Sequence, residues 1–186
     1  MSSKVEICNM ALGRVNSPFI DSIDEKSKEA KICRLYYDQC RKAALRAHGW
    51  NFATETVDLA LLAETKPEWD FVYQIPSDCL KVIGIVPAIS GKKIPYKISG
   101  KKILTNMEEA TLRYVKDITD PNMFDDQFIV ALSYLLASDI AVPLTGKPAY
   151  KNNNYQFYVN ELNQAKTADA DEAQEEVEDS ILNSRN

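Results

Sequence analysis

Glycine, proline and cysteine are all scarce in this chain, which has 6, 8 and 4 of them among 186 residues. So few glycines and prolines exclude a collagen-like or low-complexity chain. The four cysteines form no Cys-x-x-Cys pair, so we expect reduced thiols in a cytosolic protein rather than a disulfide scaffold. With 45% hydrophobic and 26% charged residues, the composition is that of one globular domain, or of one domain that carries an insertion.

Long apolar runs are also missing. No run approaches the roughly 20 residues that cross a bilayer, and residues 1–6 lack the apolar core of a signal peptide. The sequence therefore predicts neither a membrane span nor export.

Motifs of catalysis and metal binding are absent as well. The chain has no phosphate-binding glycine loop, no G-x-S-x-G and no H-E-x-x-H. Its one histidine, His48, stands at the expected end of a helix. Cys33 and Cys40 share a helix face but lie about 10 Å apart along the axis, too far for one zinc ion. We predict no catalytic residue, no cofactor and no metal site.

Asp139 is the best candidate for an unusual group, because it falls within the most apolar segment of the chain. A carboxylate in such surroundings needs a hydrogen-bonding or charged partner. We expect a hydrogen bond between helices, or an ion pair with Arg41 or Arg34, and favour this structural role over catalysis.

Negative charge is concentrated at the C-terminal end. The formal net charge is −5, yet residues 169–186 hold seven of the 27 acidic residues and only Arg185 of the 22 basic ones. The rest of the chain is therefore almost neutral. Because the segment has no aromatic residue and no broad apolar face, we expect it to be disordered alone and to order on a partner.

Hydrophobic periodicity predicts helices at both ends of the chain and strands in the middle. Spacings of three and four predict helices over residues 3–14, 25–48 and 125–142, and a fourth stripe of Tyr155, Tyr158, Leu162 and Ala165. Alternation predicts strands from residue 54 to 116, including an aromatic strand from Trp69 to Ile75. The fold class is α+β: a four-helix core (residues 1–52 and 118–168), an inserted antiparallel β-rich subdomain (53–117) and an extended acidic C-terminal tail (169–186).

Capping residues and surfaces follow from the same pattern. We expect the second helix to be capped by one of Asp21, Ser22 and Asp24, and the third helix to end at Pro143 and Gly146. Small residues form one face of the second helix, so another helix or another subunit could approach it closely.

Lysines gather around a short repeat, Ile89–Ile94 and Ile98–Ile103, which puts Ser-Gly-Lys-Lys at two expected hairpin turns. The five are Lys92, Lys93, Lys97, Lys101 and Lys102. On loop tips they could contact phosphate without reading a base sequence. Solvated turns that guard an exposed sheet edge are the favoured explanation.

A set of landmarks in fixed order resembles a known family. They are the helix Cys8-Asn-Met-Ala-Leu-Gly13, then Ala30, Tyr37 and Arg41, then Gly49-Trp50-Asn51-Phe52-Ala53, Tyr73-Gln-Ile-Pro-Ser-Asp-Cys-Leu80, Leu112-Arg-Tyr114, and Phe124 with Ala131, Leu135 and Ala141. Over residues 5–146 this arrangement is similar to the head-to-tail adaptor proteins of short-tailed bacteriophages, often called tail tubular protein A.

The resemblance implies a dodecameric ring beneath the portal, through which genomic DNA passes into the tail. Its partners would be the portal protein, the tail nozzle or tail tube protein and further copies of the chain, with no membrane. Its place would be the virion neck or tail, and the host cytoplasm during assembly.

The resemblance also implies that the C-terminal extension docks on the portal. Within it we single out Asp169, Asp171, Glu172, Val177, Ile181 and Leu182 as portal-binding residues.

Two other functions stay open. Some relatives have been discussed as cell-wall hydrolases, and in a phage-encoded peptidoglycan hydrolase Asp139 or Glu108 would be the residues to test. A non-specific DNA-binding assembly factor would use the hairpin lysines.

Overall fold

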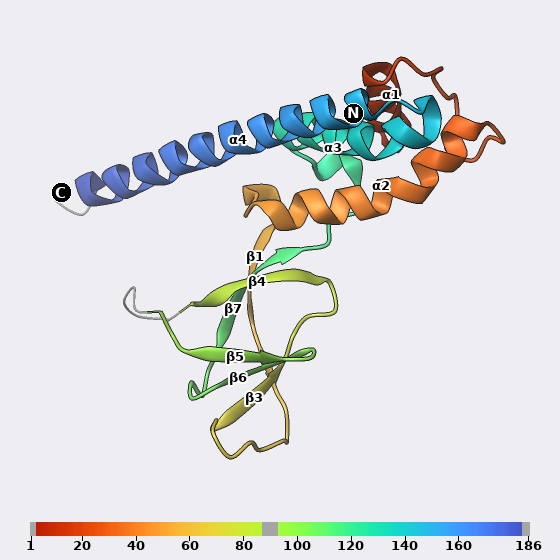
Figure 1. Ribbon diagram of the computed structural model, residues 1–186. Helices are drawn as coiled ribbons and strands as arrows, with labels where there is room; N and C mark the ends of the chain where they lie inside the picture. Colours follow the sequence, from red (N-terminus) through yellow and green to blue (C-terminus); the bar gives the residue numbers. More distant parts are fainter. Residues whose placement is uncertain (1–2, 87–92, 184–186) are drawn as a thin grey trace. The chain divides into compact units, whose positions relative to one another are not determined.

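The computed structural model describes residues 3–86 and 93–183, with side chains up to residue 168. The chain divides into two compact units, a helical unit (Met1–Phe52 and Ile118–Asn186) and a β unit (Ala53–Asp117). Figure 1 shows the helices of the first unit and the strands of the second. The predicted α+β fold class is confirmed.

Helix α3 (Asp126–Thr145) is the centre of the helical unit. Helices α1 (Lys4–Arg14), α2 (Lys28–Ala47) and α4 (Pro148–Asn183) all pack against it. Its buried residues lie on every side of the helix and include Phe128, Leu132 and Leu136. This confirms the prediction of a central helix that is apolar over most of its circumference.

The length and composition of α3 would also allow it to cross a membrane. The sequence prediction that no run approaches a membrane span was therefore wrong for this helix. Most of its apolar length is buried within the described part of the chain, which is the environment of a core helix.

The small-residue face of α2 is internal. Ala30, Cys33, Cys40 and Ala44 are at most 1% exposed, and α2 packs on α3 and α1. The close approach that small residues allow is therefore used within one chain. The alternative, that this face receives another subunit, was wrong.

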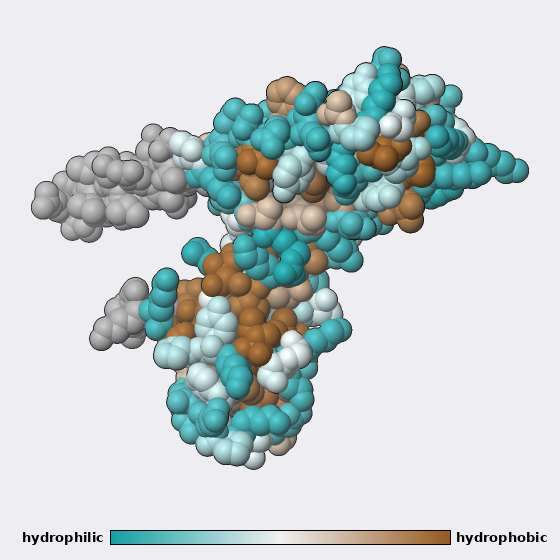
Figure 2. All heavy atoms as spheres, in the orientation of Figure 1, coloured by the Kyte–Doolittle hydropathy of each residue, from teal (hydrophilic) through white to brown (hydrophobic). Residues whose placement is uncertain are grey.

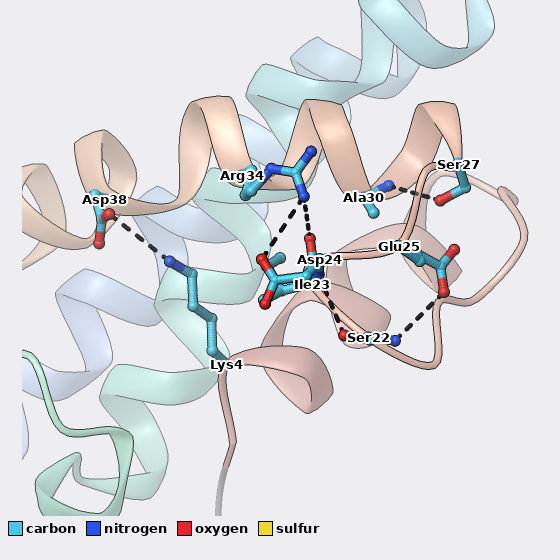
Figure 3. Close-up of polar contacts among 9 residues, drawn as sticks. All are labelled: Lys4, Ser22, Ile23, Asp24, Glu25, Ser27, Ala30, Arg34 and Asp38. Carbon is cyan, nitrogen blue, oxygen red and sulfur yellow. Dashed lines mark hydrogen bonds and ion pairs between the residues drawn. The ribbon is translucent and has the colours of Figure 1, made fainter.

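Helix α2 is capped by Ser27, whose Oγ accepts from the Ala30 N–H at 3.1 Å. The predicted caps Asp21, Ser22 and Asp24 belong to the preceding turn, where the Glu25 carboxylate accepts from the N–H groups of Asp21 and Ser22. Figure 3 shows the contact with Ser22. An N-cap must stand directly before the first helical residue. The predicted cap was wrong because the helix begins three residues later than the periodicity indicated.

Helix α3 ends at Gly146, which has a φ of +68° and donates its N–H to the Val142 carbonyl at 2.9 Å. Pro143 lies inside the last turn instead of ending the helix. Near a helix end the missing proline N–H removes only one hydrogen bond, so the turn persists until a left-handed residue stops it.

Helix α4 packs through Tyr158, Leu162 and Ala165, whereas Tyr155 is 48% exposed and does not belong to the packed stripe. The backbone continues as a helix to Asn183, and the ordering of residues 169–186 on a partner stays a prediction. Residues 169–183 prolong a helix that is already fixed by packing, which removes the cost of nucleation. They are also rich in alanine and glutamate, both strong helix formers.

The β unit consists of two antiparallel sheets. Strands β1 (Thr54–Asp58), β7 (Thr111–Lys116) and β4 (Cys79–Val86) form one sheet in the order β1-β7-β4. Strands β2 (Ala60–Leu61), β3 (Phe71–Gln74), β6 (Lys102–Thr105) and β5 (Tyr96–Ser99) form the other, in the order β2-β3-β6-β5. Side chains of both sheets, namely Tyr73, Ile85, Ile103, Leu112 and Tyr114, are buried together in its core.

One of the two predicted hairpin turns is confirmed. Strands β5 and β6 pair Ser99 with Lys102, and Gly100 between them has a φ of +61°. The other turn, within residues 89–94, lies mostly outside the described residues.

Candidate interaction surfaces

The six proposed portal-binding residues lie in the part of α4 for which the structure describes the backbone alone: Asp169, Asp171, Glu172, Val177, Ile181 and Leu182. Among the described side chains of α4, the last buried one is Ala165. From there to Asn183 the helix runs for about 27 Å. Figure 1 shows this end of α4 standing clear of the other helices of its unit.

The described lysines of the predicted set lie along the hairpin of β5 and β6. Lys93 precedes β5 and lines a hollow of about 380 Å³ with Ile83–Ile85 and Ile94–Tyr96. Lys101 lies at the turn after the strand, and Lys102 is paired with the Glu64 carboxylate. Lys97 is exposed on β5, and Lys92 lies outside the described residues. The described members of this set thus lie before β5, on it, in the turn after it and at the start of β6.

Asp139 is half-buried, and its Oδ2 accepts a hydrogen bond from Cys40 Sγ at 3.3 Å. The expected partners point elsewhere, because Arg34 donates to a backbone carbonyl of the preceding turn at 2.8 Å and Arg41 donates to the Ile118 carbonyl at 2.6 Å. Of the two alternatives expected for Asp139, the hydrogen bond between helices is confirmed. Burial and the Asp139 charge raise the pKa of the Cys40 thiol well above its usual range, which fits an inert, packed thiol.

Glu108, the other residue considered for a hydrolase, is exposed in the β unit, and its backbone carbonyl accepts from the Tyr73 hydroxyl. Within residues 3–86 and 93–168, no group of three or more histidine, cysteine, aspartate or glutamate side chains is arranged to hold a metal ion.

The Gly49–Ala53 landmark builds an aromatic cluster where the chain leaves the helical unit. Trp50 packs edge-to-face on Phe128 at 5.2 Å between ring centroids, and its Nε1 donates to the Ala44 carbonyl at 3.0 Å. Phe52 packs on Phe128 at the same distance, and His48 packs on Trp50. The conformation in which the chain leaves α2 is therefore fixed by rings that pack on the start of α3.

A network of four charged or polar side chains joins the strands of the first sheet. The Tyr114 hydroxyl donates to the carboxylates of Glu55 and Asp78, at 3.1 and 3.3 Å. Lys116 Nζ lies 2.8 Å from Glu55 and 3.8 Å from Asp78. The hydrogen bond from Lys116 lowers the pKa of Glu55, and the same bond raises the pKa of Lys116. Sequence reasoning missed this network because it depends on the cross-strand register that pairs Glu55 with Tyr114.

The outer face of α2 carries a row of positive charges that sequence reasoning also missed. We call it the basic face of α2; its members are all exposed and are Lys28, Lys31, Leu35, Gln39, Lys42 and Arg46. They recur at helical spacing, and Leu35 in the middle is 67% exposed. Polar residues counted with the same periodicity that located the small-residue face would have found it.

Acidic side chains also lie on α2 and in the turn before it. Beside the basic face, Asp38 is paired with Lys4 at 3.7 Å and Arg41 at 3.5 Å, and Asp24 with Arg34 at 3.8 Å (Figure 3). Both carboxylates thus pair with cations that are not members of the basic face.

Hydrophobic residues gather on the visible face of the β unit (Figure 2). The large exposed ones in this unit are Val57, Leu61, Ile83 and Ile98. The predicted aromatic strand contributes less to this surface, because Val72 and Tyr73 are buried in the core.

No protein-family model matches this chain, and no curated protein matches it.

Proposed function

We propose that this chain is a structural virion protein, a head-to-tail adaptor that forms a ring between the portal and the tail and lines the passage of DNA. The observation that carries the proposal is the architecture. A helical unit is interrupted once, between Phe52 and Ile118, by an antiparallel β unit, as the resemblance to the adaptor family implies.

The contacts of the landmark residues support an assembly role rather than a chemical one. Trp50 and Phe52 fix the exit from the helical unit through rings on α3. In the β unit, the Tyr73 hydroxyl donates to the Met107 carbonyl at 2.8 Å, and Asp78 accepts from Tyr114. Each of these side chains holds one segment of its unit against another, so their role is structural.

The long projection of α4 supports a role for the C-terminal segment in reaching a partner. The segment begins after the last described buried side chain, Ala165, and carries most of the net negative charge. We propose that it docks on the portal, and that the cost of placing it is offset by that contact.

A pull-down with the portal protein of the same phage tests both proposals. The full chain should bind the portal, and a chain ending at residue 168 should bind more weakly while unfolding at the same temperature as the full chain. Unchanged binding by the shortened chain would contradict the proposal that the C-terminal segment docks on the portal. No binding by the full chain would contradict the adaptor function.

A further inference from the structure

The helical unit buries a pair of thiols that the proposed function does not use. Cys8 of α1 and Cys33 of α2 are both 0% exposed, and both are free cysteines. Two thiols can be joined as a disulfide only when their helices place them directly opposite each other. The way in which α1 lies on α2 therefore decides what this pair can do.

The start of α1 lies against the middle of α2. Lys4 Nζ is 3.7 Å from the Asp38 carboxylate and 4.5 Å from the centre of the Tyr37 ring. Figure 3 shows the Lys4 side chain extending from the first turn of α1 to Asp38. These contacts fix one point of the register between the two helices.

The later part of α1 lies toward the start of α2. The Asn9 side chain exchanges two hydrogen bonds with the backbone of Ile20, both at 2.9 Å. The same connecting segment reaches α2 at Arg34, which donates to the Ile23 carbonyl at 2.8 Å. The two helices are therefore antiparallel where they touch.

This register places Cys8 opposite Cys33. Cys8 follows Lys4 by one helical turn, and Cys33 precedes Tyr37 by one helical turn. In an antiparallel pair, one turn forward on α1 matches one turn back on α2. The two thiols are accordingly in hydrogen-bond contact.

Cys40 is the competing thiol, but it is engaged elsewhere. It lies two helical turns beyond Cys33 on α2, and its Sγ donates to Asp139 Oδ2 at 3.3 Å. Cys79, the fourth cysteine, belongs to the β unit. The arrangement therefore favours a link between Cys8 and Cys33.

We infer that Cys8 and Cys33 form a disulfide that joins α1 to α2 when the protein meets a small organic disulfide as oxidant. The Cys33 thiolate attacks one sulfur of the oxidant, and the other half leaves as a thiolate. The Cys8 thiolate then attacks Cys33 Sγ and displaces the second half. The two protein thiols lose two electrons and two protons, and the oxidant is reduced to two thiols that carry those protons.

The order of attack follows from the contact between the two thiols. The hydrogen bond from Cys8 lowers the pKa of Cys33, so Cys33 ionises first. Because both thiols are buried, the oxidant reaches them only when α1, a helix of 11 residues, opens locally. Oxidation should therefore be slow, and a reducing thiol buffer should keep the pair reduced. The inference does not depend on the adaptor function.

Peptide mapping of the oxidised protein tests the inference. The full chain with Cys79→Ser, which lacks the accessible thiol of the β unit, is incubated with bis(2-hydroxyethyl) disulfide. Free thiols are then alkylated, and the protein is digested with trypsin without reductant. Because trypsin cleaves after lysine and arginine, Cys8 lies in peptide 5–14, Cys33 in peptide 32–34 and Cys40 in peptide 35–41. Mass spectrometry should show peptide 5–14 linked to peptide 32–34.

Two controls show that the link depends on the fold. The same chain with Cys40→Ser added should form the same link, whereas oxidation in concentrated urea should give a mixture of pairings. Thermal unfolding gives a second measurement that needs no substitution in the core. The oxidised protein should unfold about 5 °C or more above the reduced protein, because the link restricts the unfolded chain.

Three results would overturn the inference. The first is that peptides 5–14 and 32–34 both remain alkylated after prolonged oxidation, or carry the reagent as mixed disulfides. The second is that either peptide is linked to peptide 35–41 instead. The third is that the oxidised protein unfolds at the same temperature as the reduced protein or below it.

Discussion

Arg14 shows how one side chain ties three helices together. Its guanidinium carbon lies 3.6 Å from the centre of the Tyr134 ring, and its Nε and Nη2 donate to Ser133 Oγ at 3.1 and 2.9 Å. The Tyr134 ring stacks in turn on Phe157 of α4 at 5.3 Å. Partial burial lowers the pKa of Arg14, and the ring face compensates part of the lost hydration.

We expect Arg14→Ala to lower the free energy of unfolding by about 1–2 kcal/mol, since it removes a cation–ring contact and two hydrogen bonds. The free energy of unfolding of Arg14→Lys should lie between those of the wild type and Arg14→Ala, because lysine keeps the charge but lacks the planar guanidinium group. Urea denaturation followed by far-UV circular dichroism measures both. Equal midpoints for the wild type and Arg14→Ala would contradict this account of the α1–α3 contact.

The four cysteines differ in accessibility. Cys8, Cys33 and Cys40 are at most 1% exposed, whereas Cys79 is half-buried. A hydrogen bond with Cys33, together with burial, raises the pKa of Cys8. The sequence predicted free thiols, but the difference between them depends on tertiary packing.

We therefore expect one fast-reacting thiol, Cys79, in the native protein and four in denaturant. Reaction with a chromogenic disulfide reagent at neutral pH counts them, and Cys79→Ser should remove the fast phase. A fast phase that persists in Cys79→Ser would show that the helical unit opens readily.

At the scale of elements, the first sheet depends on the network of Glu55, Asp78, Tyr114 and Lys116. The pKa of Glu55 is lowered in the folded state and that of Lys116 is raised. The Glu55 contribution is present above its ordinary pKa of 4.5 and is lost as the pH falls through the folded value. The Lys116 contribution is present below its ordinary pKa of 10.5 and is lost as the pH rises through the folded value.

Lys116→Met should accordingly be less stable than the wild type at neutral pH, and the difference should shrink toward both acidic and alkaline pH. Urea denaturation over a pH series measures this difference. Lys97→Met, at an exposed position of β5, should not differ from the wild type in this pH-dependent way. A constant difference at all pH values would mean that Lys116 acts through packing rather than charge.

The turn between β5 and β6 requires a left-handed residue. Gly100 has a φ of +61°, and a Cβ there would meet nothing within 4 Å, so the cost of a side chain is one of backbone conformation alone. We expect Gly100→Ala to destabilise the protein by about 1 kcal/mol. Gly84→Ala is the matched control, because that position is equally open and has no positive φ; thermal unfolding that ranks the two variants equally would contradict the argument.

Helices and strands were largely predictable, because hydrophobic periodicity reflects burial directly. Their ends and partners were less so. Ser27 caps α2 in place of the predicted residues, whereas α3 ends at Gly146 as predicted, with Pro143 inside the helix. Asp139 was recognised as unusual, but its partner Cys40 follows from how α2 and α3 are packed together, which no local pattern contains.

At the scale of the whole molecule, the charged surfaces differ in how directly they can be found in the sequence. The acidic end of α4 was visible in the sequence as a run, whereas the basic face of α2 is dispersed over 19 residues and emerges only on a helix. The described lysines of the predicted set lie before β5, on it, in the turn after it and at the start of β6, so their contact with phosphate stays a prediction. Sequence reasoning thus locates a charged surface most easily where its residues are also neighbours in the sequence.

The adaptor function is the central claim, and imaging tests it most directly. Negative-stain electron microscopy of the full-length protein mixed with the portal of the same phage should show an added dodecameric ring on one end of the portal. Portal particles that remain unchanged at saturating protein concentration would contradict the account.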